Sequence, residues 1–225
     1  MDSGKPSERR TATGADATRL ALIAAGLKLF GERGFEATST RELAAAAQAN
    51  IGSITYHFGS KEGLRGACAR HIVATMRAIA APAIGLDGPL PGPQEAEARL
   101  LGGVSHLVRF LVTEPAAGEI VQFVLRELSA PGTGLAILYE GVFEPIHRRL
   151  CQLWGLATGT DPESEATRLA VFSMIGQVVY FRIGREAVLR RMGWADYGSA
   201  EAERLTALFQ TNLKAALDAR KRAAP

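Results

Sequence analysis

Apolar residues recur along nearly the whole chain at the three- and four-residue spacing of amphipathic helices. Five residues form the first apolar face: Leu20, Ile23, Ala24, Leu27 and Phe30. Gly31 and Gly34 follow, and because glycine is common just past helix C-termini they predict the end of this helix.

The next stretch predicts two short helices followed by a long one. Ser39 and Glu42 have the spacing of a capping box, which marks the start of a helix with its apolar face on Leu43, Ala44 and Ala47. A second short helix is expected from near Asn50 to Phe58, and a third, longer one over 61–81.

Four prolines and three glycines lie between residues 82 and 93 and predict a loop. Beyond it we expect further helices at about 95–113, 116–129, 134–156, 162–186 and 200–221. No segment alternates apolar and polar residues as a half-buried strand would. The pattern therefore predicts an all-α protein.

Composition indicates in which cellular compartment the chain works. No apolar run approaches the roughly 20 residues of a membrane span, so we expect no membrane partner. Residues 1–15 are polar, carry Lys5, Arg9 and Arg10, and lack the apolar stretch of a signal peptide. We interpret them as a disordered basic arm and expect a cytoplasmic protein. Cys68 and Cys151 are predicted to be buried thiols and not a disulfide.

The charge is unevenly distributed. Residues 1–80 hold 11 Lys or Arg and 7 Asp or Glu, whereas the remainder holds 15 basic and 16 acidic residues. The whole net charge of +3 therefore comes from the first third of the chain. This asymmetry is typical of a nucleic-acid-binding head on a neutral body.

Residues 38–61, TSTRELAAAAQANIGSITYHFGSK, have the layout of a helix-turn-helix. In that arrangement the second helix enters the major groove, where base edges present distinguishable donors and acceptors. Leu43, Ala47, Ile54 and Phe58 can face the core. We predict that nine residues contact DNA: Thr40, Arg41, Asn50, Gly52, Ser53, Thr55, Tyr56, His57 and Lys61. An unrelated pair of short helices in a bundle is the alternative.

The run from Thr18 to Leu64 resembles the DNA-binding domain of the TetR/AcrR family. The resemblance is carried by ALIAAGLKLFGERGFEATSTRELA, by Ile54 with Tyr56-His57-Phe58, and by GSKEGL. YEGVFEPIHRRLCQLW and IGQVVYFRIGREAVLRRMGW are similar to the CecR-like branch of that family. The resemblance implies a repressor that responds to a drug or metabolite, and a homodimer formed by two C-terminal helices.

The later helices suggest a ligand pocket. Polar groups among apolar runs are either satisfied internally or orient a ligand. Seven residues are predicted to bind an organic effector: Phe123, Glu127, Tyr139, Phe143, His147, Gln177 and Tyr180. Glu140, Glu144, His147 and Cys151 also share a helix face, which leaves a transition-metal sensor as an alternative.

No HExxH, CxxC, G-x-S-x-G, P-loop or G-x-G-x-x-G motif is present, so an enzyme is not expected, nor a cofactor. We predict a helix-turn-helix domain over 16–63 and a ligand-binding and dimerisation domain over 64–225. The chain would be a homodimeric regulator, released from a palindromic DNA operator by a small molecule. A helical adaptor that does not bind DNA stays the third alternative.

Overall fold

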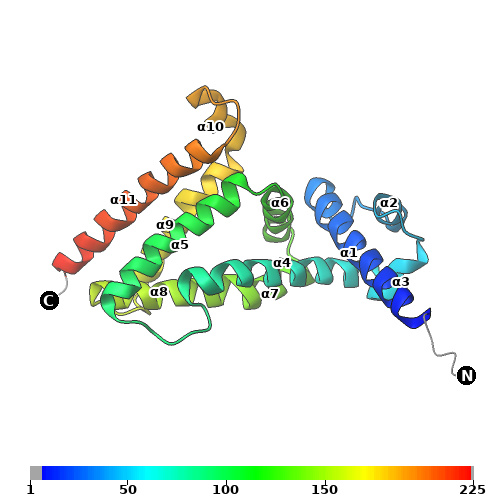
Figure 1. Ribbon diagram of the computed structural model, residues 1–225, viewed down its shortest axis with the longest axis horizontal. Helices are drawn as coiled ribbons and strands as arrows, with labels where there is room; N and C mark the ends of the chain where they lie inside the picture. Colours follow the sequence, from blue (N-terminus) through cyan, green and yellow to red (C-terminus); the bar gives the residue numbers. More distant parts are fainter. Residues whose placement is uncertain (1–6, 224–225) are drawn as a thin grey trace, which may run out of the picture. The chain divides into compact units, whose positions relative to one another are not determined.

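The computed structural model describes residues 7–223, and over these residues it contains helices and no strand (Figure 1). The all-α prediction is confirmed. The helices, in chain order, are α1 (Ser7–Arg33), α2 (Thr40–Ala46), α3 (Gly52–Phe58), α4 (Lys61–Ile84), α5 (Pro93–Thr113), α6 (Ala116–Ser129), α7 (Thr133–Leu138), the π-helical turn η1 (Tyr139–Phe143), α8 (Glu144–Thr158), α9 (Glu165–Ile183), α10 (Arg185–Met192) and α11 (Ser199–Ala223).

The chain divides into two compact units. The N-terminal unit holds Met1–Val73 and Glu119–Leu138, and the C-terminal unit holds Ala74–Gly118 and Tyr139–Pro225. Helix α4 begins in the first unit and ends in the second. Compactness thus assigns most of α6 and all of α7 to the N-terminal unit. The sequence-based division at residue 63 separates a DNA-binding part from a ligand-binding part. It stays a prediction.

In the N-terminal unit, α1 packs against α2 and α3, which also contact each other. Leu43 of α2 and Ile54 of α3 are fully buried between them, with Phe30 of α1. Ala47 and Phe58 are half-buried. The core-facing side of the two short helices is therefore the one that the sequence predicted.

The start of α1 differs from the expected disordered arm over 1–15. The helix begins at Ser7, while residues 1–6 lie outside the described residues. Extending an existing helix fixes few torsions for each new hydrogen bond, and no proline stands between residues 7 and 15 to stop it. The amphipathic stretch that begins at Leu20 thus extends back into the polar segment.

Other boundaries differ from the pattern as well. The helix expected over 162–186 is α9, which ends at Ile183, and the separate α10 follows it. Helix α4 continues past Pro82 to Ile84 and ends where Gly85 adopts a φ of +60°. The single helix expected over 134–156 is instead α7, the turn η1 and α8, with Pro145 in the first turn of α8. Proline has no N–H to donate to the carbonyl four residues earlier, which accounts for the wider π turn before it.

The capping box predicted at the start of α2 is confirmed. The Glu42 N–H donates to Ser39 Oγ at 3.2 Å, and the Ser39 N–H donates to Glu42 Oε2 at 2.9 Å. The backbone hydrogen bond from Ser39 lowers the pKa of Glu42, and the Ser39 hydroxyl and Arg33 add to this effect. This box fixes where α2 begins after the loop at Thr38.

Because the folded-state pKa of Glu42 is lowered, its carboxylate stabilises the fold above the unfolded pKa of about 4.3 and loses this effect as pH falls. We therefore expect Glu42→Gln to be less stable than the wild type at pH 7 and to match it near pH 2. Ser39→Ala is the comparison: it removes the cap on the Glu42 N–H as well as one hydrogen bond to the Glu42 carboxylate, so part of its deficit of about 1 kcal/mol should remain near pH 2. Urea denaturation at several pH values measures both, and a pH-independent Glu42→Gln deficit would contradict this account.

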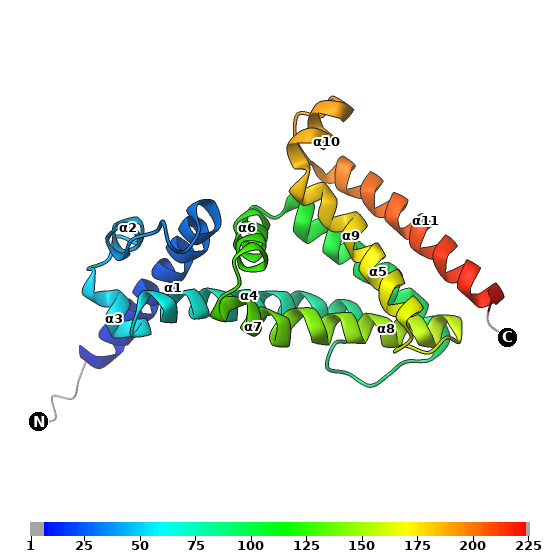
Figure 2. The same ribbon diagram turned by 180° about the vertical axis from the view of Figure 1, so that it is seen from behind.

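In the C-terminal unit, α5 packs against α8, α9 and α11, as the two opposite views show (Figures 1 and 2). Its core is centred on Trp154 and Leu153 of α8 and Leu217 of α11, all at most 1% exposed. Over residues 7–223, each helix is either too short or too polar to span a bilayer.

Candidate nucleic-acid interface and ligand cavity

Helices α2 and α3 are joined by a turn over residues 47–51. The turn reverses the chain at Gln48, which adopts a left-handed φ of 51°. Asn50 then stabilises the start of α3, because its Oδ1 accepts a hydrogen bond from the Gly52 N–H at 2.9 Å. Two short helices on one core, with a tight turn between them, are the helix-turn-helix predicted from the sequence.

The side of α3 away from the core carries the polar residues that the sequence selected. Tyr56 is 81% exposed, and Asn50 and Thr55 are also exposed. Ser53 and His57 are half-buried, with the rings of Tyr56 and His57 edge to face at 4.9 Å. Because the Tyr56 side chain does not contribute to the core, its ring is available to contact a binding partner.

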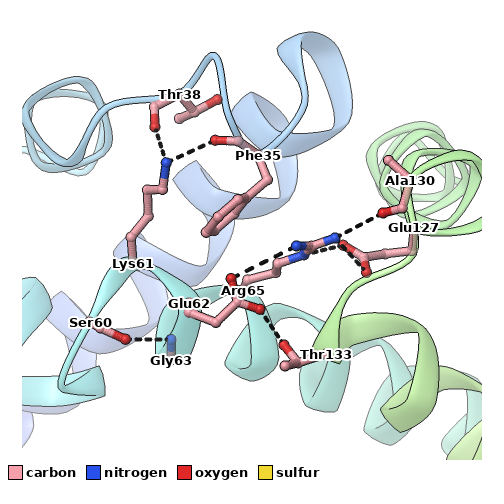
Figure 3. A network of polar contacts seen from close by, with 10 residues as sticks. All are labelled: Phe35, Thr38, Ser60, Lys61, Glu62, Gly63, Arg65, Glu127, Ala130 and Thr133. Carbon is pink, nitrogen blue, oxygen red and sulfur yellow. Dashed lines mark hydrogen bonds and ion pairs between the residues drawn. The ribbon is translucent and has the colours of Figure 1, made fainter.

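Of the remaining predicted DNA contacts, Arg41 and Gly52 are exposed and Thr40 is half-buried. Lys61 is different, because its ammonium is engaged within the N-terminal unit. Its Nζ donates to the carbonyls of Phe35 and Thr38, each at 3.0 Å, and lies 4.1 Å from the centre of the Phe35 ring (Figure 3). One of its three N–H groups is left for a phosphate, so its DNA contact stays a prediction.

A buried ion pair joins α4 to α6 in the same unit. Arg65 and Glu127 are 9% and 3% exposed, and the guanidinium makes two hydrogen bonds to the carboxylate, Nε to Oε1 at 2.6 Å and Nη2 to Oε2 at 3.0 Å (Figure 3). Nη2 also donates to the Ala130 carbonyl. A Cβ at Gly132 or Gly134 would overlap this pair, so the two glycines allow α7 to approach it.

A cavity of about 120 Å³ lies inside the C-terminal unit. Helices α4, α5, α8, α9 and α11 all contribute to its walls. Its lining is apolar apart from His106, whose Nδ1 lies 3.0 Å from the Gly102 carbonyl. The lining includes Met76, Leu107, Ile146, Trp154, Met174 and Val178.

The seven predicted ligand residues do not come together around this cavity, and none of them lines it. Phe123 packs against Phe30 and Glu127 pairs with Arg65, both in the N-terminal unit. Tyr139 and Tyr180 are exposed. Five of the seven predicted residues carry polar groups, whereas the cavity is lined mainly by apolar residues of the same kind as the core.

The other three predicted ligand residues lie on η1, α8 and α9, all in the C-terminal unit. Phe143 is half-buried. His147 stacks on Phe172 with ring centres 3.8 Å apart, and Gln177 accepts a hydrogen bond from Asn212 at 3.0 Å. Their role in ligand binding stays a prediction.

The stripe considered as a metal site holds one close pair, with Cys151 Sγ 3.7 Å from His147 Nδ1. Burial raises the pKa of the Cys151 thiol to about 11, with a smaller effect of Glu163. Over the part of the chain that the structure describes, no three His, Cys, Asp or Glu residues are grouped as a metal site would need.

Helix α9 carries apolar residues that its own unit does not cover. Leu169, Phe172, Tyr180 and Ile183 are each more than half exposed and share one face with Gly176. A Cβ at Gly176 would meet no atom within 4 Å. We call this set the α9 stripe.

Comparison with known proteins identifies both parts of the chain. Residues 22–68 match the model of the bacterial regulatory proteins of the tetR family, and residues 96–220 match the C-terminal domain of the HTH-type transcriptional dual regulator CecR. The CecR protein of Shigella flexneri is 36% identical over 188 residues, which are 81% of this chain and 83% of that protein. The HTH-type transcriptional repressor Rv3405c of Mycobacterium tuberculosis is 28% identical over 176 residues, 76% and 94% of the two chains.

Solved structures share the fold. A putative transcriptional regulator from Pseudomonas aeruginosa PAO1 has a TM-score of 0.66 at 15% identity, covering 91% of this chain and 92% of that one. AibR, in complex with isovaleryl coenzyme A and operator DNA, has a TM-score of 0.64 at 17% identity, covering 86% and 96%. With a helix-turn-helix at its N-terminus and a CecR-type C-terminal domain, the chain belongs to the TetR family of DNA-binding transcriptional regulators, a family without enzymatic activity.

Proposed function

We propose that this regulator is a homodimeric repressor that binds a palindromic operator through α3 and leaves it when a small organic ligand binds the C-terminal unit. The exposed polar side of α3, centred on Tyr56, carries the proposal. Tyr56 and Thr55 are exposed there, while α3 packs against α1 and α2 through its other side.

Roles within the interface follow from where each side chain lies on the two helices. Asn50, Ser53 and Tyr56 would contact base edges, where sequence is recognised. The remaining predicted residues would bind the phosphate backbone. Such contacts fix the register of α3 on the DNA but carry no sequence information. They are Thr40, Arg41, Gly52, Thr55, His57 and Lys61.

The α9 stripe supports the homodimer. An apolar helix face is unfavourable when it is exposed to water. A second copy of the chain would bury this face in a two-fold interface. Gly176, at the centre of the stripe, would let the two α9 helices approach closely. A two-fold dimer presents two α3 helices to half-sites about one DNA turn apart.

Gly176→Arg should convert the dimer into a monomer. The side chain has room in an isolated chain, because no atom lies within 4 Å of its Cβ, but it would place a charge in the dimer interface. Light scattering should give twice the 23.9 kDa chain mass for the wild type and the single mass for the variant. Gly102→Arg, on α5 and equally open, is the control and should stay dimeric. A wild type at 23.9 kDa would contradict the dimer.

The effector would act through linkage. A ligand that binds the form with low DNA affinity more tightly must weaken DNA binding by the same factor. The apolar cavity offers such a ligand a place in the C-terminal unit. The structure of the similar AibR holds both an acyl coenzyme A and operator DNA, which is consistent with a small-molecule effector here.

Selection from random DNA duplexes tests the proposal. We expect enrichment of a two-fold symmetric motif whose half-sites are centred roughly 10 base pairs apart, with affinity that falls steeply as salt rises. A promoter that carries this motif should be less active when the protein is present. Failure to enrich any motif would refute operator binding, and increased transcription would refute repression.

A further inference from the structure

A buried arginine lies at the C-terminal end of α4. Arg149 of α8 is 5% exposed, and its guanidinium donates from Nε to the Ile84 carbonyl at 3.2 Å and from Nη2 to the Pro89 carbonyl at 2.9 Å. Both acceptors are neutral, although the end of a helix carries a partial negative charge. No ion pair between Arg149 and a carboxylate occurs among the described residues.

A second arginine adjoins it. Arg99 of α5 donates from Nε and Nη2 to one oxygen of Glu95, at 3.0 and 2.6 Å. Its Nη1 is buried and has no hydrogen-bond partner in the described part of the chain. Burial and the nearby charge of Arg99 lower the pKa of Arg149, so the two cations raise each other's free energy.

Gly85 lies between the two guanidinium groups. A Cβ on this residue would overlap Nη1 of Arg99 and come within 3.3 Å of Nη2 of Arg149. Its positive φ of 60° and the missing side chain thus allow both groups to converge at the end of α4. Among the described residues the two guanidinium groups have one carboxylate partner, Glu95, which pairs with Arg99 and leaves a net positive charge beside the buried Arg149.

Ile84 connects this charge with the apolar cavity. Ile84 lines the cavity and its carbonyl accepts the hydrogen bond from Arg149 Nε, although neither guanidinium group lines the cavity itself. A ligand with an apolar part and an anionic end would therefore meet both surfaces. An unpaired buried N–H costs free energy that an oxygen acceptor would recover, and charge-assisted bonds to guanidinium are among the stronger hydrogen bonds.

We propose that the effector is an amphipathic anion, whose carboxylate or phosphate binds the guanidinium groups of Arg99 and Arg149 beside Gly85 while its apolar part fills the cavity. The inference rests on the proposed function, because it names the class of ligand that would release DNA. The volume of about 120 Å³ fits a small group, since a cavity of roughly 150 Å³ holds benzene. A chain of about six carbons is the matching length.

Trp154 lines the cavity and reports its occupation. We would titrate the intact chain, with Trp194→Phe to remove the second tryptophan, and follow the fluorescence of Trp154. The probes are hexanoate, hexyl phosphate, hexan-1-ol and inorganic phosphate. We expect the two amphipathic anions to bind at least tenfold more tightly than hexan-1-ol, and inorganic phosphate to bind more weakly than hexyl phosphate.

Arg99→Gln should abolish this tenfold preference, and Arg99→Lys, which keeps the charge, should retain part of it. Arg148→Gln is the matched control, because Arg148 is the exposed neighbour of Arg149 and pairs with Glu144. Circular dichroism confirms that each variant is folded. Equal binding of hexanoate and hexan-1-ol, or an unchanged preference in Arg99→Gln, would overturn the anion site.

Operator affinity measured with the same samples separates this inference from the proposed function. We expect hexanoate or hexyl phosphate to weaken operator binding in the wild type and to have no such effect in Arg99→Gln. An operator that binds normally but is indifferent to all four probes would overturn the effector class and leave DNA binding intact. Failure to select an operator would instead refute the proposed function.

Discussion

Tyr56→Ala is expected to reduce operator affinity at least a hundredfold while the chain stays folded. Tyr56 is 81% exposed and contributes nothing to the core, so its loss should not disturb α3. A good base contact contributes about 1–3 kcal/mol, and a two-fold dimer would lose it at both half-sites. Fluorescence anisotropy with the selected operator measures the effect.

Tyr139→Ala is the control for this prediction. Tyr139 is also an exposed tyrosine, at 56%, but it belongs to the C-terminal unit. We expect the control to bind the operator as the wild type does. Operator affinity unchanged in Tyr56→Ala, or lowered equally in both variants, would mean that Tyr56 does not read DNA.

Glu127→Ala should lower the free energy of unfolding by about 3–5 kcal/mol, the cost of leaving one member of a buried ion pair alone. The Arg65 guanidinium would keep its contact with the Ala130 carbonyl and its place over the Phe35 ring. It would also keep a longer ion pair with the more exposed Glu62 at 3.8 Å, but its buried carboxylate partner would be gone. Urea denaturation followed by circular dichroism provides the measurement.

The double variant Arg65→Met with Glu127→Met tests the cause. Replacing both members by apolar groups removes the buried charges together, so it should recover most of the lost stability. Glu144→Ala, which breaks the exposed pair with Arg148, should cost under about 1 kcal/mol. A Glu127→Ala deficit as small as that of Glu144→Ala would show that the buried pair contributes little.

Local pattern was sufficient for most of the helices and for which residues of α2 and α3 face the core. The three- and four-residue spacing placed Leu43 and Ile54 in the core and left Tyr56 outside, because these choices depend only on helix periodicity and hydrophobicity. The Ser39–Glu42 capping box was also predictable, since both partners lie within one helical turn.

Features that depend on distant parts of the chain were not predictable in this way. Arg65 and Glu127 are 62 positions apart, and Glu127 was interpreted as a ligand residue because its buried partner could not be known. The cavity lining has the same chemistry as the core, so periodicity cannot separate the two. Only the packing of five helices leaves a space beside Trp154.

The most direct test of the central claim is an equilibrium titration of the intact protein on the selected operator and on the same duplex with both half-sites scrambled. We predict that the operator binds at least a thousandfold more tightly than the scrambled duplex, which lies within the usual range of specific over non-specific affinity. Equal affinity for the two duplexes would contradict it, because binding would then depend on the phosphate backbone alone and α3 would read no sequence.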